Sequence, residues 1–208
     1  MTITKLEKQK KARQRWNIYA DGEFFCGLYE DTILKFGVHV NEELTEKELE
    51  EIKSFDEYVY GKNIAYNFLA YRIRTVSEIK KKLKEKKISE KAITKVLELL
   101  EKQKLTDDVE FARALIEERL RLKPVGKKIL RQKLFEKGVP KLIGEQALEK
   151  VFSGIDEKDL ALANFRKYYP KIKEKEYPEQ KRKVFDFLAR KGFDFDVINE
   201  IMRQELKA

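Results

Sequence analysis

The sequence contains very few of the residues on which disulfide frameworks and many catalytic sites depend. Cys26 is the one cysteine among 208 residues, which excludes an internal disulfide framework and suits a reducing compartment. We interpret Cys26 as a small apolar residue of a strand. His39 is the one histidine. Its place between Val38 and Val40 predicts a histidine on a strand surface rather than a general base or a metal ligand.

The common motifs for binding nucleotides and metals are also missing. The chain has no Gly-rich phosphate loop of either common kind, no zinc-like cluster and no plausible nucleophile–base pair. Asp107-Asp108 could hold Mg²⁺, but two carboxylates at the start of a helix complement the helix dipole, and we favour that interpretation. We therefore expect no enzymatic activity, no metal and no cofactor.

Long apolar segments are absent as well. Charged residues make up 40% of the chain and the mean hydropathy is -0.62. No run approaches the length of a membrane span, and the first residues, MTITKLEKQKKARQRW, carry charges without an apolar signal core. These features predict a soluble cytoplasmic protein without a membrane partner, and nothing in the sequence indicates an obligate oligomer, so we expect a monomer.

A unit that occurs three times at a period of about fifty residues is the most informative feature present. The strings EIKKKLKEKKI, ILRQKLFEKGV and RKVFDFLARKGF align. The matching apolar positions are Ile79, Leu130 and Val184; Leu83, Leu134 and Leu188; and Leu97, Leu148 and Met202. Self-similarity at this period indicates stacked supersecondary units that cannot bury their apolar faces alone.

These patterns predict a mainly α fold. We expect three tandem three-helix repeats that form an elongated curved array, with a small N-terminal β-hairpin or strand region. The predicted parts are residues 1–60 (a basic arm over 1–15, strands over 16–44 and a lead-in helix), the first repeat 61–105, the second repeat 106–155 and the third repeat 156–208.

Turn and capping residues support this division. Asp21-Gly22 between two aromatic and β-branched runs predicts a hairpin, and Gly27 could mark a bulge. Two Thr–Glu pairs have the spacing of a capping box, Thr45 with Glu48 and Thr75 with Glu78. Gly138 and Gly192 suit left-handed helix ends. Lys87 stands at the equivalent place in the first repeat, and we expect that turn to close differently.

Positive charge is concentrated in the first repeat. Residues 61–105 carry 13 basic and 5 acidic side chains, a net of +8, whereas residues 1–60 have a net of -4. The second and third repeats have nets of +3 and +2. A field of one sign attracts polyanions.

The equivalent second helices of the repeats carry most of the candidate binding residues. The candidates are Arg72, Arg74, Lys80, Lys81, Lys84, Lys87, Lys127, Lys128, Arg131 and Lys133. A lysine-rich helix is often only a solvated face, but recurrence in equivalent helices favours binding of a polyanion. The many aromatic residues recur at helical spacing beside aliphatic ones, which favours core packing over base stacking.

Two stretches resemble the RecX family of recombination regulators. AYNFLAYRIRTVSEIKKKL (65–83) and LTDDVEFARALIEERLRLKPVGKKILRQKLFEKGV (105–139) match in order and spacing. The residues that carry the resemblance are Ala65, Leu69, Arg72, Ser77-Glu78-Ile79, Leu83, Leu105, Asp107-Asp108, Phe111-Ala112, Arg119, Gly126, Ile129, Leu134 and Lys137-Gly138-Val139. The match is weaker over the third repeat.

The resemblance implies tandem three-helix repeats and a protein that modulates the RecA recombinase in DNA repair and recombination. In that family the body lies in the groove of the RecA–single-stranded DNA filament and typically inhibits ATP hydrolysis and strand exchange. The implied partners are therefore the RecA filament and single-stranded DNA. The charge of the first repeat leaves an alternative open, a single- or double-stranded DNA-binding module that acts without RecA.

Overall fold

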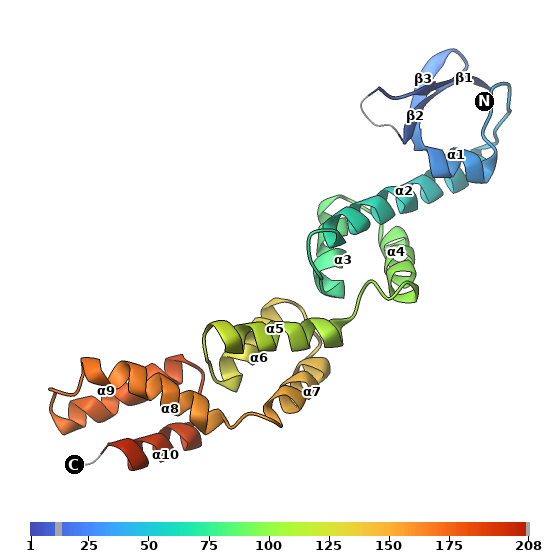
Figure 1. Cartoon of the computed structure of the whole chain (residues 1–208). Helices are drawn as coiled ribbons and strands as arrows, with labels where there is room; N and C mark the ends of the chain where they lie inside the picture. The colour runs from blue at the N-terminus through green and yellow to red at the C-terminus, as the bar shows by residue number, and fades with distance from the viewer. Residues whose placement is uncertain (11–13, 207–208) are drawn as a thin grey trace. The chain divides into compact units, whose positions relative to one another are not determined.

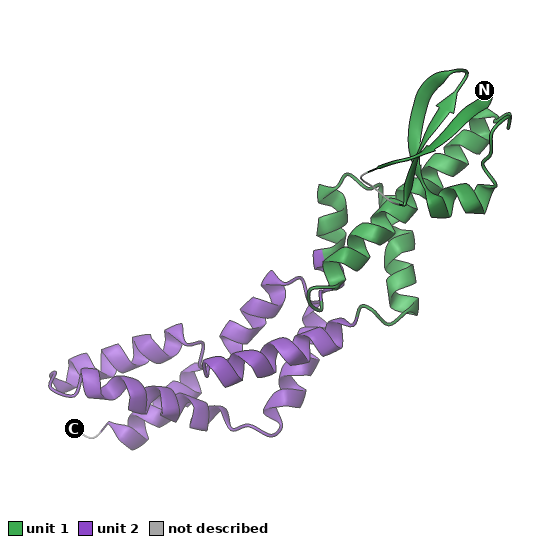
Figure 2. Cartoon of the chain, turned by 45° about the horizontal axis from the view of Figure 1, so that its top comes forward, with its two compact units in different colours: residues 1–73, 79–106 green, residues 74–78, 107–208 purple. Residues whose placement is uncertain are grey.

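The computed structural model describes residues 1–10 and 14–206 (Figure 1). The chain folds into two compact units, which Figure 2 distinguishes by colour. The first unit contains residues 1–73 and 79–106, and the second contains residues 74–78 and 107–208. The division into four parts at residues 60, 105 and 155 stays a prediction.

The N-terminal part is a three-stranded antiparallel sheet in the order β1-β2-β3. Its strands are β1 (Ile3–Lys8), β2 (Arg15–Ala20) and β3 (Glu23–Tyr29). The predicted hairpin is confirmed, because Asp21 and Gly22 have φ values of 50° and 89° between β2 and β3. The bulge, however, lies at Phe25, since Ile18 pairs with Cys26 and Tyr19 with Phe24. Gly27 pairs regularly and adjoins the Arg15 guanidinium instead.

Three further predictions for this region are wrong. The described residues of the predicted arm contain the edge strand β1, whose exposed charged side chains are typical of a protected sheet edge; residues 11–13 of that arm lie outside the described residues. The predicted strand segment 16–44 contains a helix, α1 (Glu30–Phe36). Gly37 ends α1 with a φ of 68°, and His39 then lies exposed in a loop rather than on a strand.

A single long helix joins the sheet to the first repeat. This helix, α2 (Glu46–Leu69), begins at the predicted capping box of Thr45 and Glu48. It continues without a break through residue 60, so the predicted lead-in helix and the first helix of the repeat are one element. Ile52 lies in the core under the sheet and Ala65 lies in the core of the first repeat.

The remaining helices form three three-helix repeats. The first repeat is completed by α3 (Val76–Glu85) and α4 (Glu90–Lys102), and the second contains α5 (Asp108–Leu122), α6 (Lys127–Glu136) and α7 (Lys141–Phe152). The third contains α8 (Glu157–Tyr168), the short 3₁₀ helix η1 (Tyr169–Lys171), α9 (Tyr177–Arg190) and α10 (Phe195–Glu205). First and third helices pack together in each repeat, as α2 with α4, α5 with α7 and α8 with α10.

Each repeat has its own buried core, and the aligned apolar positions lie in it. Ile79 and Leu83 of α3, like Val184 and Leu188 of α9, are completely buried. Leu130 and Leu134 of α6 occupy the same positions in the second repeat and are at most 2% exposed. The fifty-residue period in the sequence therefore corresponds to a repeated core.

The second helices α3 and α6 each begin at a contact with the first helix of the following repeat. We call this contact a joint, and both joints lie within the second unit. Asp108, the first residue of α5, accepts a hydrogen bond from the Val76 amide at 3.0 Å. Glu157, the first residue of α8, accepts one from the Lys127 amide at the same distance. Val76 and Lys127 begin α3 and α6. A carboxylate from the next repeat therefore satisfies an amide at a helix start that would otherwise lack a partner.

Close backbone approach completes each joint. The Thr75 hydroxyl donates to the Lys137 carbonyl at 2.7 Å, and the Gly126 amide donates to the Lys191 carbonyl at 2.9 Å. Gly138 and Gly192, with φ values of 72° and 84°, end α6 and α9 at these contacts. The predicted left-handed glycine ends are therefore confirmed.

Candidate nucleic-acid interface

The predicted cations of α3 and of the turn after it lie on exposed positions, and two of them share one acidic partner. Lys84 and Lys80 contact the Glu90 carboxylate at 2.6 Å and 3.4 Å. The hydrogen bond from Lys84 holds the pKa of Glu90 below its ordinary value. Lys81 and Lys87 are exposed and form no ion pair with a described residue. These four lysines belong to the first unit.

The predicted cations of α6 are mostly engaged in contacts within the second unit. Lys127 and Lys128 contact Glu157 and Asp194 of the third repeat at 3.6 Å and 3.2 Å. Arg131 contacts Glu145 at 2.7 Å, a hydrogen bond that raises the pKa of its guanidinium. Lys133 contacts Glu136 at 2.6 Å. Binding a polyanion through this helix would require these carboxylates to be displaced.

Arg72 and Arg74 lie in the segment between α2 and α3. Arg72 is exposed and donates to the Ile73 carbonyl at 2.8 Å, while Arg74 is half-buried and belongs to the second unit.

The aromatic residues serve the core only in part. Phe111, Phe165 and Phe193 are at most 5% exposed, as core packing predicts. In contrast, the side chains of Tyr71 and Phe135 are 86% and 81% exposed. Exposed rings of this kind are available for contact with another molecule.

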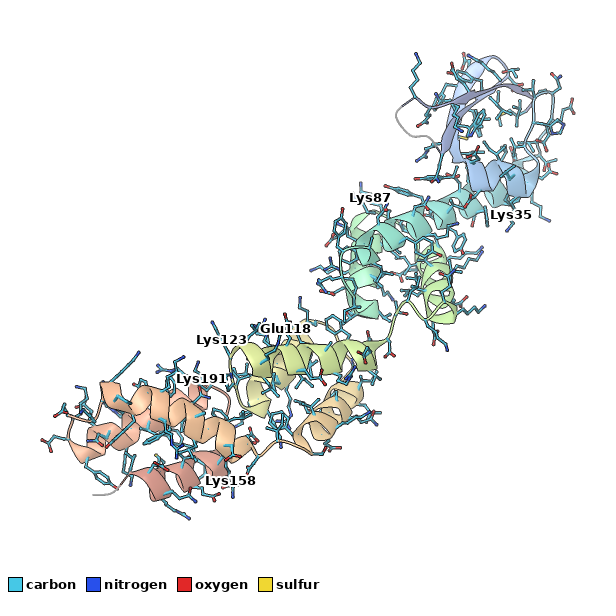
Figure 3. All side chains as sticks on the ribbon, viewed as in Figure 1. Lys35, Lys87, Glu118, Lys123, Lys158 and Lys191 are labelled. Carbon is cyan, nitrogen blue, oxygen red and sulfur yellow. The ribbon has the colours of Figure 1, made fainter. Side chains whose placement is uncertain are left out.

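A groove in the second unit gathers cations that the sequence pattern did not single out. It is a cavity of about 450 Å³ between the end of α5 and the helices α8 and α9. Four lysines line it: Lys123, Lys167, Lys171 and Lys191. No described residue of its lining is acidic, and none of the four lysines forms an ion pair with a described carboxylate. Figure 3 labels Lys123 and Lys191 at this groove.

Two aromatic rings form part of the groove wall. The rings of Tyr168 and Phe187 stack with centroids 4.0 Å apart and an angle of 7° between their planes. The Lys191 ammonium lies 5.5 Å from the centroid of Phe187. Lys167 and Lys171 are four residues apart, with Tyr168 between them. This spacing is the one feature of the sequence that could have indicated the groove.

The described residues offer little support for metal binding or for thiol chemistry. The described residues contain no group of three or more His, Cys, Asp or Glu that could hold a metal ion. Burial raises the pKa of the Cys26 thiol to about 11, which keeps the thiolate scarce. Asp107 caps α5 through the amides of Val109 and Glu110, so the helix-start interpretation is confirmed for this residue. Within the described ranges no helix has both the length and the apolar character of a membrane span.

Family models match four segments of the chain. They are the regulatory protein RecX N-terminal domain over residues 1–45 and the RecX first, second and third three-helix domains over residues 62–100, 107–148 and 156–202. The chain thus combines a small N-terminal sheet with three three-helix domains. It belongs to the RecX family, as the resemblance in the sequence predicted.

Individual relatives agree with this assignment. The regulatory protein RecX of Staphylococcus aureus (strain JH9) is 36% identical over 147 residues, which cover 71% of this chain and 54% of the relative. For the protein of strain Newman, 36% identity extends over 137 residues, or 66% and 50% of the two chains. The chain therefore spans about half the length of the curated relatives it matches.

Solved structures support the same fold. A crystal structure of regulatory protein RecX has a TM-score of 0.77 and 29% identity over 97% of this chain and 98% of that chain. RecX from Lactobacillus salivarius has a TM-score of 0.67 and 25% identity, covering 72% of this chain and 96% of its own.

Proposed function

We propose that this protein binds filaments of RecA on single-stranded DNA and inhibits their ATP hydrolysis and strand exchange. The observation that carries the proposal is the succession of RecX family matches over the sheet and all three repeats. A series of repeats suits a filament, because weak contacts with successive subunits add through effective concentration. We further propose that the protein acts by binding and not by catalysis. Its monomeric state and cytoplasmic location stay predictions.

The test is RecA ATP hydrolysis on single-stranded DNA, with this protein added at increasing ratios. We expect the rate to fall at ratios well below one molecule per RecA, since a regulator within a filament affects many subunits. An unchanged rate, together with no binding to RecA filaments, would contradict the proposal.

Charge-reversal variants examine the predicted contact residues in the same assay. Lys81→Glu combined with Lys87→Glu changes two exposed lysines that form no ion pair with a described residue. We expect the variant to need a higher concentration for half-inhibition. Unchanged inhibition by the folded variant would remove Lys81 and Lys87 from the proposed contact.

A DNA-binding module independent of RecA is a second candidate, favoured by the net charge of +8 over residues 61–105. It predicts that inhibition appears only when the protein is in excess and coats the DNA. Binding to bare DNA would then be tight and would fall steeply as salt is added.

A further inference from the structure

We propose that the groove lined by Lys123, Lys167, Lys171 and Lys191 binds nucleotide units, with lysines on the phosphates and a base on the aromatic wall. The inference rests on the proposed function in one respect, since a regulator of such filaments encounters single-stranded DNA. It names a place on this chain that the candidate residues of α3 and α6 do not include.

Uncompensated charge is the first argument. Lys80, Lys84, Lys127, Lys128 and Lys133 all contact carboxylates. The four groove lysines have no such partner among the described residues. Two of them, Lys123 and Lys191, cap the ends of α5 and α9, where a cation complements the dipole. Each helix end contributes only about half a negative charge, so four ammonium groups leave the groove strongly positive.

The size and rigidity of the groove form the second argument. Ligand sites usually occupy about 300–1,000 Å³, and a cavity of about 450 Å³ can accept a nucleotide unit. Its walls are tied together by Asn164 of α8, which is 9% exposed. The Asn164 side-chain amide donates to the Pro124 carbonyl at 3.1 Å and to the Leu160 carbonyl at 2.8 Å. The segment that carries Lys123 is thereby held against the helix that carries Lys167.

The aromatic wall favours a nucleotide over an acidic peptide. Tyr168 and Phe187 are half-buried, and both line the cavity. A base can stack on an aromatic face, a contact worth about 1–3 kcal/mol per base in single-strand complexes. A glutamate-rich peptide would satisfy the lysines but has no group for the rings. A single DNA strand and a free nucleotide both supply a phosphate and a base, and a competition experiment distinguishes between them.

The test compares charge-neutralised variants of the full chain in binding to a fluorescent oligodeoxythymidylate. Lys167→Gln with Lys171→Gln removes two charges from the groove. Lys141→Gln with Lys150→Gln removes two exposed charges from α7 and serves as the matched control. We expect the groove variant to bind roughly fivefold to tenfold more weakly. The plot of log K against log salt should become less steep by about 1.4, because each of the two lost phosphate contacts on a single strand contributes about 0.7 to the steepness.

An oligonucleotide that carries 5-iodouracil locates the bound base. Irradiation should crosslink it to the peptide that contains Tyr168, and the crosslink should disappear in the Tyr168→Leu variant. Circular dichroism and thermal unfolding verify that each variant remains folded. If Tyr168→Leu unfolds the third repeat, the comparison of the groove lysine variant with its α7 control still tests the proposal.

Competition distinguishes the sources of the ligand. Displacement by ATP at millimolar concentration would assign the groove to free nucleotides, and resistance to ATP would assign it to a strand; both results support the nucleotide chemistry. Equal losses in the two lysine pairs, or displacement by polyglutamate as efficient as by unlabelled oligonucleotide, would overturn the proposal. RecA-dependent inhibition is measured separately, so a groove without nucleotide binding leaves the proposed function to its own test.

Discussion

Asp56 of α2 is a buried carboxylate that fixes the connection between β3 and α1. Its Oδ1 accepts hydrogen bonds from the Tyr29 amide at 2.7 Å and from the Thr32 hydroxyl at 2.8 Å. The side chain is 8% exposed. Burial raises the pKa of Asp56 above its ordinary value of 3.8, because loss of water outweighs these two hydrogen bonds.

We predict that Asp56→Asn gains stability relative to the native protein as the pH rises. An acid whose pKa is raised in the folded state favours folding in its protonated form. That contribution is present below pH 3.8 and is lost as the pH rises through the folded value. Asparagine keeps an oxygen at the same place and cannot ionise, so it retains both hydrogen bonds without the cost of a buried charge.

The measurement is urea unfolding of both proteins at several pH values from 3.5 to 7. Glu50→Gln, which changes an exposed carboxyl of the same helix, is the control. A native protein that gains stability relative to Asp56→Asn with rising pH would show that the carboxylate is favourably bound.

At the scale of elements, the turn after each second helix differs according to what it meets. The turn residues Lys87, Gly138 and Gly192 all have positive φ values, 60°, 72° and 84°. An added Cβ at Gly192 would lie 2.6 Å from Ile129 Cγ1, and one at Gly138 would overlap Ser77. The described residues that precede the first repeat form the sheet and α1, so the turn at Lys87 does not pack on an earlier three-helix repeat. Lysine is therefore tolerated there because only backbone conformation, and not close packing, opposes a side chain.

We predict that Gly192→Ala costs considerably more stability than Lys87→Ala. The left-handed conformation costs alanine about 1–2 kcal/mol, and overpacking against Ile129 adds about 1–3 kcal/mol. Lys87→Ala exchanges one strained side chain for another and should cost under about 0.5 kcal/mol. Thermal and urea unfolding of the two variants gives the comparison. Similar losses would mean that the joint between the second and third repeats can relax around a methyl group.

At the scale of the whole molecule, each of the three repeats contains a hydrophobic core of its own. Structures of this kind have stabilities close to a sum over units and neighbouring contacts. We predict that Leu188→Ala, which empties a completely buried position in α9, costs about 2–5 kcal/mol and acts mainly on its own repeat.

Hydrogen exchange followed by mass spectrometry measures this directly. Exchange should rise over α8, α9 and α10 and stay near native rates in α3 and α4. Leu142→Ala, at an exposed position of α7, is the control. An equal rise throughout the chain would indicate a single cooperative unit instead.

Much of the helical fold could be predicted, because its signals are local. Helix α3 begins where Thr75 predicted its start, and α2 begins at the predicted capping box of Thr45 and Glu48. Helix α1 was missed because its β-branched and aromatic residues resemble a strand, whereas its buried hydrogen bond between Thr32 and Asp56 joins residues 24 positions apart. Edge strand β1 was missed because exposed charges hide its alternation.

The groove could not be predicted for a related reason. Its lysines come from the end of α5, from the region around η1 and from the end of α9, which only tertiary folding brings together. The lysine-rich stretches of α3 and α6 were conspicuous in the sequence, yet most of their charge is paired with carboxylates, some of which lie in the following repeat. Local charge density therefore gave a poor guide to uncompensated charge.

The continuity of α2 has a consequence for how the sheet and the first repeat can vary. Both cores lie on one uninterrupted helix, with Ile52 in the first and Ala65 in the second. A helix advances 1.5 Å and turns about 100° per residue. One residue inserted between these positions would rotate the sheet about the helix axis by about 100°, whereas seven residues would restore its direction to within about 20°. The length of α2 thus sets a rotational phase, and viable insertions or deletions there should come in near-whole turns.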